Sequence, residues 1–410
     1  MLPAGSPLPD WLTWLETLSP TEIDLGLERV QLVLDRLALP RPPHVLLIAG
    51  TNGKGSCVAM TDALLRAANY RVGAYTSPHI IDYNERIKVQ GSQVSDAAIV
   101  AAFEKIEAVR DGVLLTYFEY GTLAALLLFA EAALDVWILE VGMGGRLDAT
   151  NAVDPTGVLI TNVSLDHCAW LGHDIETIAV EKAGVMRAGR PAVFGAAEVP
   201  RTIVEHAENI GAQLLLRNRD YSLDAVPQLG LRGEFQVGNA AAVIALLKAV
   251  GLETATDQDL VAAVLPTVRV TGRGQSIVQD GIEWLLDVAH NPAAAEALAG
   301  MLAAKDHPGA TFAIVGMLDD KDVESSVRWL DEHVDHWIAV TAESHRALPA
   351  RELARRIANA CARPCLVAES LQDAMESARR EASINDRILV TGSFYLVGPV
   401  LEQLYSRPES

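Results

Sequence analysis

A glycine-rich stretch near the N-terminus contains the residue types that bind phosphate groups. Residues Gly50–Ser56 read Gly-Thr-Asn-Gly-Lys-Gly-Ser and follow the apolar run His44–Ala49. Glycines let backbone N–H groups turn towards one point, and a helix that begins there adds unpaired N–H groups and partial positive charge. Lys54 would neutralise the outer phosphates, and the Ser56 hydroxyl would reach a Mg²⁺ ion. Although Gly55 separates the lysine from the serine, the order of strand, turn and helix predicts a nucleoside triphosphate site.

Further chemically active side chains stand where later apolar runs end. Glu140 ends one run, and a carboxylate beside a phosphate loop is where a Mg²⁺ ligand is needed. His167 follows Asp166 after the next run, and a neutral imidazole nitrogen can also hold a metal. Lys182 lies on an expected helix, where it could be simple countercharge. Taken one at a time, these residues also suit ordinary structural roles, so their spacing leaves both interpretations open.

A second polar group occurs late in the chain. Asp287, His290 and Asn291 stand on the turn after an apolar run, and Pro292 begins the next helical stretch. Asp287 would hold a ribose, and the other two would face a cleft between domains. A helix-capping turn is the alternative, and it would need only one such residue. Ser393 follows the last apolar run in the same way, as a weaker signal.

The elements that must position these residues are short apolar strands alternating with amphipathic helices. This alternation predicts an α/β fold with a parallel sheet covered on both faces, whose ligands bind at the carboxyl ends of the strands. We therefore expect Gly50, Ser77, Glu140 and residues 164–167 to meet along one edge. The strands expected in this first series are 45–49, 72–76, 136–141, 158–163 and 192–195.

A second series of strands begins near residue 280 and predicts a smaller, Rossmann-like α/β domain. Residues 265–274 contain one proline and two glycines and are the expected linker. A chain of 410 residues suits two or three domains. We therefore divide it into residues 1–270 and 271–410. The strands expected in the second series are 283–288, 311–315, 337–340, 364–367 and 388–390.

Composition limits the function classes. A net charge of −20 and a pI near 4.9 argue against a nucleic-acid surface. Four cysteines make neither a disulfide framework nor a zinc site with recognisable spacing. The apolar stretch 121–130 is interrupted at Glu131 and is too short to span a bilayer. Because the N-terminus has no signal-peptide pattern, we expect a cytoplasmic protein without membrane partners.

Seven segments together resemble the folylpolyglutamate synthase and dihydrofolate synthase family of the Mur-ligase superfamily. They occur in the order of the family's motifs and extend over essentially the whole chain, which makes them far more specific than a phosphate loop alone. The segments are Gly50–Ser56, Thr76–His79, Phe118–Tyr120, Leu139–Asn151, Leu165–His167, Glu181–Gly184 and Leu286–Pro292.

The resemblance implies a Mur-ligase-like ATPase domain, which also binds the pterin, followed by a glutamate-binding ligase domain. It also implies a role for individual residues. Those expected to bind ATP are Asn52, Gly53, Lys54, Gly55, Ser56, Asn239, Arg273 and Asp287. Those expected to hold two Mg²⁺ ions are Ser77, Glu140 and His167, beside a carbamylated Lys182. Those expected on the pterin side are Thr21, Glu22, Ile23, Asp24, Phe118, Leu147, Asp148 and Ala149. His290 and Ser393 are expected to bind glutamate. Lys54, Glu140, His167 and Lys182 are the residues expected to serve catalysis.

The implied reaction is ATP-dependent ligation of L-glutamate to dihydropteroate and to reduced folates such as tetrahydrofolate, by a monomer. An enzyme that only lengthens the polyglutamate tail is the first alternative. A Mur-type peptidoglycan ligase is disfavoured because only 49 residues precede Gly50, too few for a further N-terminal domain. A nucleotide-dependent switch would not need the second polar group, and a small-molecule kinase would need no amine acceptor.

Overall fold

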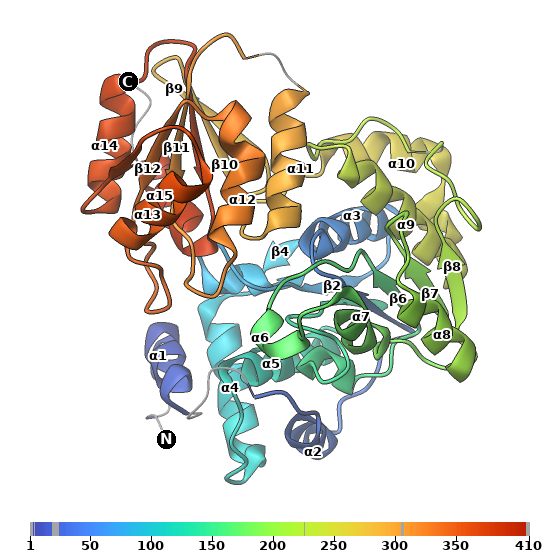
Figure 1. Ribbon diagram of the computed structural model, residues 1–410. Coiled ribbons are helices and arrows are strands. Elements are labelled where there is room, and N and C mark those ends of the chain that lie inside the picture. Colours follow the sequence, from blue (N-terminus) through green and yellow to red (C-terminus); the bar gives the residue numbers. More distant parts are fainter. Residues whose placement is uncertain (1–2, 4, 19–23, 225, 305–306, 407–410) are drawn as a thin grey trace. The chain divides into compact units, whose positions relative to one another are not determined.

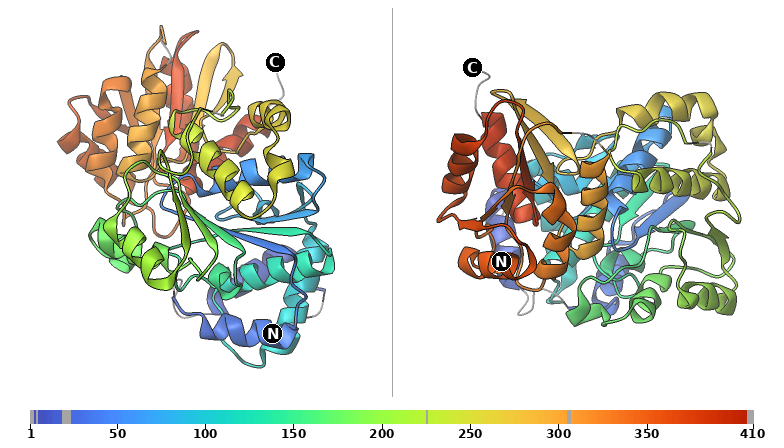
Figure 2. Two further views of the ribbon diagram at one scale, coloured as in Figure 1. Left: turned by 90° about the vertical axis from the view of Figure 1, so that its right-hand side faces the viewer. Right: turned by 45° about the horizontal axis from the view of Figure 1, so that its top comes forward.

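The computed structural model describes residues 3, 5–18, 24–224, 226–304 and 307–406. The chain forms two compact units (Figures 1 and 2). The N-terminal unit contains residues 1–163, 174–228 and 238–268, and the C-terminal unit contains residues 164–173, 229–237 and 269–410. In the part of the chain that is described, no helix combines the length and the apolar character needed to cross a membrane.

The N-terminal unit is built on an eight-stranded sheet in the order β4-β3-β2-β5-β1-β6-β7-β8. Strands β2, β5, β1, β6, β7 and β8 are parallel, while β3 and β4 add an antiparallel edge. The parallel strands form because their residues are almost all apolar and buried, as in β1 and β5. The strands are β1 (His44–Ala49), β2 (Val72–Tyr75), β3 (Ile87–Val89), β4 (Ser92–Gln93), β5 (Val136–Glu140), β6 (Gly157–Ile160), β7 (Pro191–Phe194) and β8 (Gln213–Leu216).

Helices cover both faces of this sheet. One face packs on a continuous apolar core with residues from α1, α2, α4, α5, α7 and α8, and α3 contacts β1, β2 and β5. The helices are α1 (Leu8–Leu18), α2 (Glu28–Leu37), α3 (Lys54–Ala67), α4 (Asp96–Arg110), α5 (Tyr117–Glu131), α7 (Ile175–Ala183), α8 (Arg201–Ile210), α9 (Phe235–Ala249) and α10 (Gln258–Val264). The first three residues of α9 group with the C-terminal unit.

The C-terminal unit has a six-stranded sheet in the order β13-β12-β11-β14-β10-β9, in which only the pairing of β9 with β10 is antiparallel among the described strands. Helices α11, α12 and α13 pack on one face, and α14 and α15 contact β11, β12 and β14 (Figure 1). The strands are β9 (Gln275–Gln279), β10 (Ile282–Asp287), β11 (Thr311–Val315), β12 (His336–Ala339), β13 (Cys365–Val367) and β14 (Arg387–Thr391). The helices are α6 (Cys168–Leu171), α11 (Pro292–Ala303), α12 (Val323–Leu330), α13 (Ala350–Ala360), α14 (Leu371–Glu381) and α15 (Phe394–Ser406).

The two expected series of parallel strands are confirmed, as is the α/β fold class. Because β2, β5, β1 and β6 are neighbours, Gly50, Ser77 and Glu140 lie at the same edge of the first sheet, as predicted. Residues 164–173 and 229–237 group with the C-terminal unit, which the division at residue 270 does not anticipate. The functions assigned to residues 1–270 and 271–410 stay predictions.

Candidate functional site

The phosphate loop lies between β1 and the first turn of α3, and its backbone requires glycine at two positions. Gly50 has φ +138° and Gly53, the N-cap of α3, has φ +85°, both in the region that favours glycine. A side chain on Gly50 would overlap the hydroxyl of Thr161, and a Cβ on Gly53 would lie 2.9 Å from Nδ2 of Asn239. Asn239, predicted to bind ATP, therefore lies against the loop.

Hydrogen bonds hold this loop in place. The amide of Asn52 donates to Oδ1 of Asn162 (3.0 Å). The Lys54 ammonium donates to the carbonyl oxygens of Gly50 (3.0 Å) and Thr51 (3.1 Å). The cation therefore lies over the loop and is available to exchange these carbonyl oxygens for phosphate oxygens. This is the local geometry that the sequence predicts for a triphosphate site.

The carboxylate of Glu140 is placed next to the start of α3. Glu140 ends β5, is 5% exposed and accepts a hydrogen bond from the amide of Ser77 (3.2 Å). A Cβ on Gly55 would lie 3.7 Å from Oε2 of Glu140. Burial, together with the negative charge of Glu140, raises the pKa of the Cys57 thiol. The structure thus brings Ser77 and Glu140 together beside the phosphate loop.

This donor set fits magnesium bound together with phosphate. Mg²⁺ is usually held by one or two carboxylates and by substrate phosphates, with water filling the other positions. No group of three or more His, Cys, Asp and Glu side chains arranged to hold a metal occurs among the described residues. Ser77 and Glu140 supply a hydroxyl and a carboxylate of the required kind. His167, the third predicted ligand, groups with the C-terminal unit, and its role stays a prediction.

Lys182 lies in the last turn of α7 and is 3% exposed. The loop after β5 packs closely on this turn, because a Cβ on Gly145 would lie 3.2 Å from the Cα of Lys182. Arg146 of the same loop pairs with Glu181 at 2.8 Å. The loop that begins at Glu140 is therefore fastened to the helix that carries Lys182.

The residues predicted on the pterin side come from one loop and one helix. The ring of Phe118 lies against Gly142, where a Cβ would come within 2.7 Å of it. Leu147 is half-buried and Ala149 is buried. Asp148 accepts hydrogen bonds from the Met143 and Thr150 amides and from the Thr150 hydroxyl, so it orders the loop. Burial raises its pKa despite these hydrogen bonds.

Arg29 links the N-terminal segment to α5. Its guanidinium pairs with Asp24 at 2.6 Å and with the buried Glu119 at 2.9 Å. Asp24 is thereby tied to the helix that carries Phe118. Thr21, Glu22 and Ile23, also predicted on the pterin side, lie outside the described residues.

Arg273 and Asp287 come together in the C-terminal unit. The Asp287 carboxylate accepts hydrogen bonds from the amides of Gly274 (2.8 Å) and Ala289 (2.9 Å). Burial raises the pKa of Asp287, and the charge of Arg273 opposes this rise. A cavity of about 370 Å³ adjoins these residues and is lined by Gly230, Leu231, Arg232, Arg269, Val270, Thr271, Arg273, Gly274, Gln275, Ser276 and Tyr405.

The two residues predicted to bind glutamate follow neighbouring strands. His290 comes after β10 and Ser393 comes after β14, and these strands are paired. Phe394 joins the two sites, because its ring lies 5.8 Å from that of His290 and 5.3 Å from the Arg273 guanidinium. Ser393 is 3% exposed and accepts a hydrogen bond from the amide of Tyr395 (3.1 Å).

Two residues, one in each unit, were missed by the sequence reasoning. Lys321 follows β11 and is 7% exposed, and its ammonium contacts Asp166 at 2.7 Å. Asp166 also contacts His290 and Asn291. The signal for Lys321 was available, because a lysine among three aspartates follows an apolar strand at Asp319–Asp322. Arg29 offered no signal, since it lies on the polar face of an amphipathic helix.

Comparisons with known proteins show the family to which the chain belongs. The Mur ligase middle domain matches residues 48–215, and the Mur ligase glutamate ligase domain matches residues 272–394. The dihydrofolate synthase/folylpolyglutamate synthase of Escherichia coli strain K12 is 41% identical over 429 residues, covering 98% of this chain and 97% of that protein.

Two solved structures are similar over nearly their whole length. E. coli FolC in complex with DHPP and ADP has a TM-score of 0.93 at 40% identity, covering 99% of this chain and 100% of that chain. A bifunctional folylpolyglutamate synthase/dihydrofolate synthase with Mn, AMPPNP and L-glutamate bound has a TM-score of 0.89 at 40% identity, covering 98% and 99%. This chain therefore belongs to the dihydrofolate synthase/folylpolyglutamate synthase family of Mur ligases.

Proposed function

We propose that this protein uses ATP to join L-glutamate to dihydropteroate and to the γ-carboxylate of reduced folates. The observation that carries the proposal is the placement of Ser77 and Glu140 beside the phosphate loop, at the start of α3. This arrangement suits transfer of a phosphoryl group from ATP. The ADP, AMPPNP and glutamate in the names of related structures support the same assignment.

The chemistry requires activation of the acceptor. A carboxylate resists an amine because it is anionic and has a poor leaving group. Transfer of the γ-phosphoryl group from ATP to the acceptor carboxylate gives an acyl phosphate and ADP. The glutamate amine then attacks the acyl carbon, loses a proton and displaces inorganic phosphate as the amide forms.

Each predicted residue has a task in this sequence. The backbone of Asn52–Ser56 and the Lys54 ammonium would bind the phosphates, with Asn239, Arg273 and Asp287 on the rest of the nucleotide. Ser77, Glu140 and His167 would hold two Mg²⁺ ions, which supply electrostatic screening between the anionic reactants. Lys182, which is 3% exposed, would carry a carbamate, which replaces its cation with a carboxylate near the metal ions.

The remaining residues divide between acceptor and glutamate. Thr21–Asp24, Phe118 and Leu147–Ala149 would bind the pterin side of the acceptor. His290, Ser393 and Lys321 would bind the glutamate carboxylates, because hydroxyl, imidazole and ammonium groups donate to carboxylate oxygens. We also propose that the protein is a cytoplasmic monomer.

Glutamate-dependent ADP release with Mg²⁺-ATP tests the proposal, with dihydropteroate and tetrahydrofolate supplied separately. Release with both acceptors is expected. Release with tetrahydrofolate alone would leave an enzyme that only lengthens the tail. Release with neither acceptor would overturn the assignment to folates and reopen the other Mur-type amide ligases.

The carbamate on Lys182 needs its own test, by intact-protein mass spectrometry after bicarbonate is supplied and withdrawn. A Lys182→Ala variant is expected to lose the added CO₂ and most of its turnover. Unchanged turnover in this variant would refute the proposed role of Lys182.

A further inference from the structure

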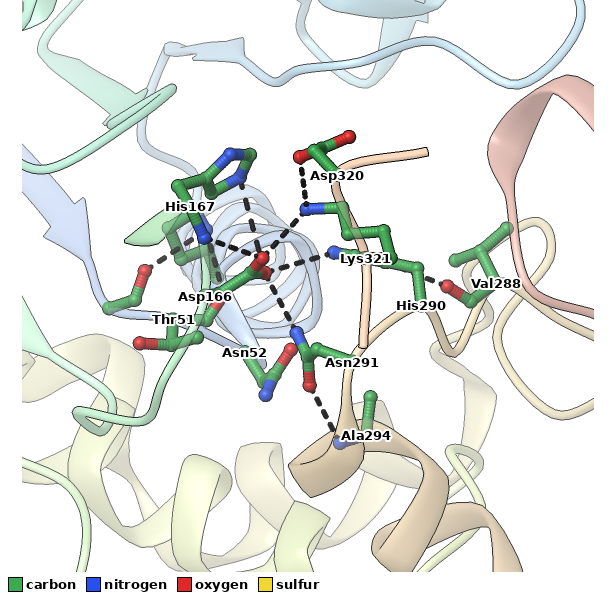
Figure 3. A network of polar contacts seen from close by, with 12 residues as sticks. Thr51, Asn52, Asp166, His167, Val288, His290, Asn291, Ala294, Asp320 and Lys321 are labelled. Atoms are coloured by element: carbon green, nitrogen blue, oxygen red, sulfur yellow. Dashed lines mark hydrogen bonds and ion pairs between the residues drawn. The ribbon is translucent and has the colours of Figure 1, made fainter. Parts of the chain in front are cut away.

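The carboxylate of Asp166 is the centre of a buried polar network in the C-terminal unit (Figure 3). Oδ1 accepts hydrogen bonds from the Lys321 ammonium (2.7 Å) and from the amide of His167 (2.8 Å). Oδ2 lies 2.9 Å from Nδ2 of Asn291 and 3.3 Å from Nε2 of His290. One carboxylate thus gathers side chains from the loops after β10 and β11.

The side chains around Asp166 are also fixed at a second point. Oδ1 of Asn291 accepts a hydrogen bond from the backbone amide of Ala294 and so caps the N-terminus of α11. Nδ1 of His290 lies 2.9 Å from the carbonyl oxygen of Val288. Each of these two side chains is therefore held from two sides, by Asp166 and by the backbone, and removal of Asp166 would leave only the backbone contact.

The burial of this network points to orientation rather than stability. The side chains of Asp166 and Lys321 are 6% and 5% exposed. A buried ion pair adds little net stability because desolvation offsets its attraction, whereas loss of one partner is costly. Such a pair is well suited to fixing geometry.

The four contacts also leave Asp166 no capacity for substrate. A carboxylate offers about four lone-pair sites, and four nitrogen atoms already surround the Asp166 carboxylate. Lys321, in contrast, has three N–H donors on its ammonium group. Any contact with an added carboxylate would therefore be made by Lys321 and its neighbours, with Asp166 acting behind them.

We propose that Asp166 is a positioning residue for the glutamate substrate, because it holds Lys321, His290 and Asn291 in the arrangement that receives the glutamate carboxylates. This inference rests on the proposed function. It assigns to Asp166 a role separate from metal binding, although His167 is its neighbour in the chain.

The test is steady-state kinetics of Asp166→Asn, with Asp320→Asn as the matched control. The asparagine amide has one oxygen that accepts hydrogen bonds and one NH₂ group that does not. The variant would therefore lose either the charged hydrogen bond from Lys321 or the contacts with His290 and Asn291. We expect KM for glutamate to rise about tenfold or more, as for loss of a hydrogen bond to a charged group. KM for ATP and for the folate acceptor should stay within about threefold of wild type.

Asp320 is a suitable control because it also lies near Lys321, at 3.5 Å, but is 28% exposed and pairs with Arg346 at 3.1 Å. We expect Asp320→Asn to change KM for glutamate by less than about threefold. A second variant, Asn291→Ser, keeps a side chain that can cap α11 and removes the amide that donates to Asp166. It should raise KM for glutamate several-fold even if Asp166→Asn fails to fold.

Coupling distinguishes positioning from a general structural effect. If Asp166 acts through Lys321, adding Asp166→Asn to Lys321→Met should raise KM for glutamate no further. Equal losses for all three substrates, additive effects in the double variant, or an unchanged KM for glutamate would each overturn the inference. Absence of glutamate-dependent ADP release in the wild-type enzyme would instead overturn the proposed function itself.

Discussion

Two glycines of the phosphate loop, Gly53 and Gly55, should tolerate an added side chain very differently, and this difference can be tested. Gly53 has φ +85°, and a Cβ there would come within 2.9 Å of Nδ2 of Asn239. Gly55 lies within α3, and a Cβ there would meet Glu140 at 3.7 Å, an ordinary contact. The same added methyl group should therefore have opposite consequences at two positions in one loop.

The size of the effect follows from these geometries. An L-residue in the left-handed region costs about 1–2 kcal/mol, and the close approach to Asn239 adds to this cost. We expect Gly53→Ala to lower the free energy of unfolding by roughly 2–3 kcal/mol. Gly55→Ala should leave it unchanged or raise it by up to about 1 kcal/mol, since alanine is the better helix former.

This difference can be measured by unfolding the full chain of each variant in urea and monitoring the N-terminal unit by circular dichroism. Binding of ATP can be titrated on the same samples. Adding Asn239→Ala to Gly53→Ala should recover the stability lost through the close contact between the new Cβ and the Asn239 side chain. It should not recover the stability lost through the left-handed φ at residue 53. Equal stabilities of Gly53→Ala and Gly55→Ala would refute the reasoning.

Three further predictions follow from buried groups. Arg29→Met leaves the buried Glu119 without its cation and should lower the free energy of unfolding by roughly 2–3 kcal/mol; a loss below about 0.5 kcal/mol in urea unfolding would contradict this. Burial and the charge of Arg86 lower the pKa of His79 from 6.5 to about 4, so the unfolded chain binds the extra proton first and stability should fall as pH drops from 6.5 to 4. Urea unfolding at both pH values should show this loss, up to about 3 kcal/mol, and His79→Gln should reduce it. Cys57 is fully buried with a raised pKa, so iodoacetamide at pH 8 should modify it only after unfolding, which peptide mass spectrometry can establish.

The central strands of both sheets were predictable because they are buried on both faces and therefore appear as continuous apolar runs. β1, β5 and β11 agree with the predicted ranges to within one residue. The edge strands were missed for the opposite reason. Ser92–Gln93 is too short and polar to produce a pattern, and Gln275–Gln279 is half-exposed with polar residues at three of its positions.

The placement of candidate residues was predictable where they stand at a strand end, as at Glu140 and Asp287. Lys321 was missed because its partner Asp166 is 155 residues away in the chain. Arg29 was missed because its two carboxylate partners come from different elements, Asp24 and α5. Local patterns predict the strand ends, whereas such partnerships arise only when distant segments pack together.

The contact between Asp166 and Lys321 also has a consequence for synthesis of the chain on the ribosome. Translation at 5–20 residues per second implies that Lys321 emerges about 8–30 seconds after Asp166. Throughout this interval the segment 164–173 has been made, but the C-terminal unit is incomplete because residues 321–410 are still to be synthesised. The nascent protein must therefore keep the Asp166 carboxylate in water until Lys321 has been made, and fragments that end before residue 321 lack this partner.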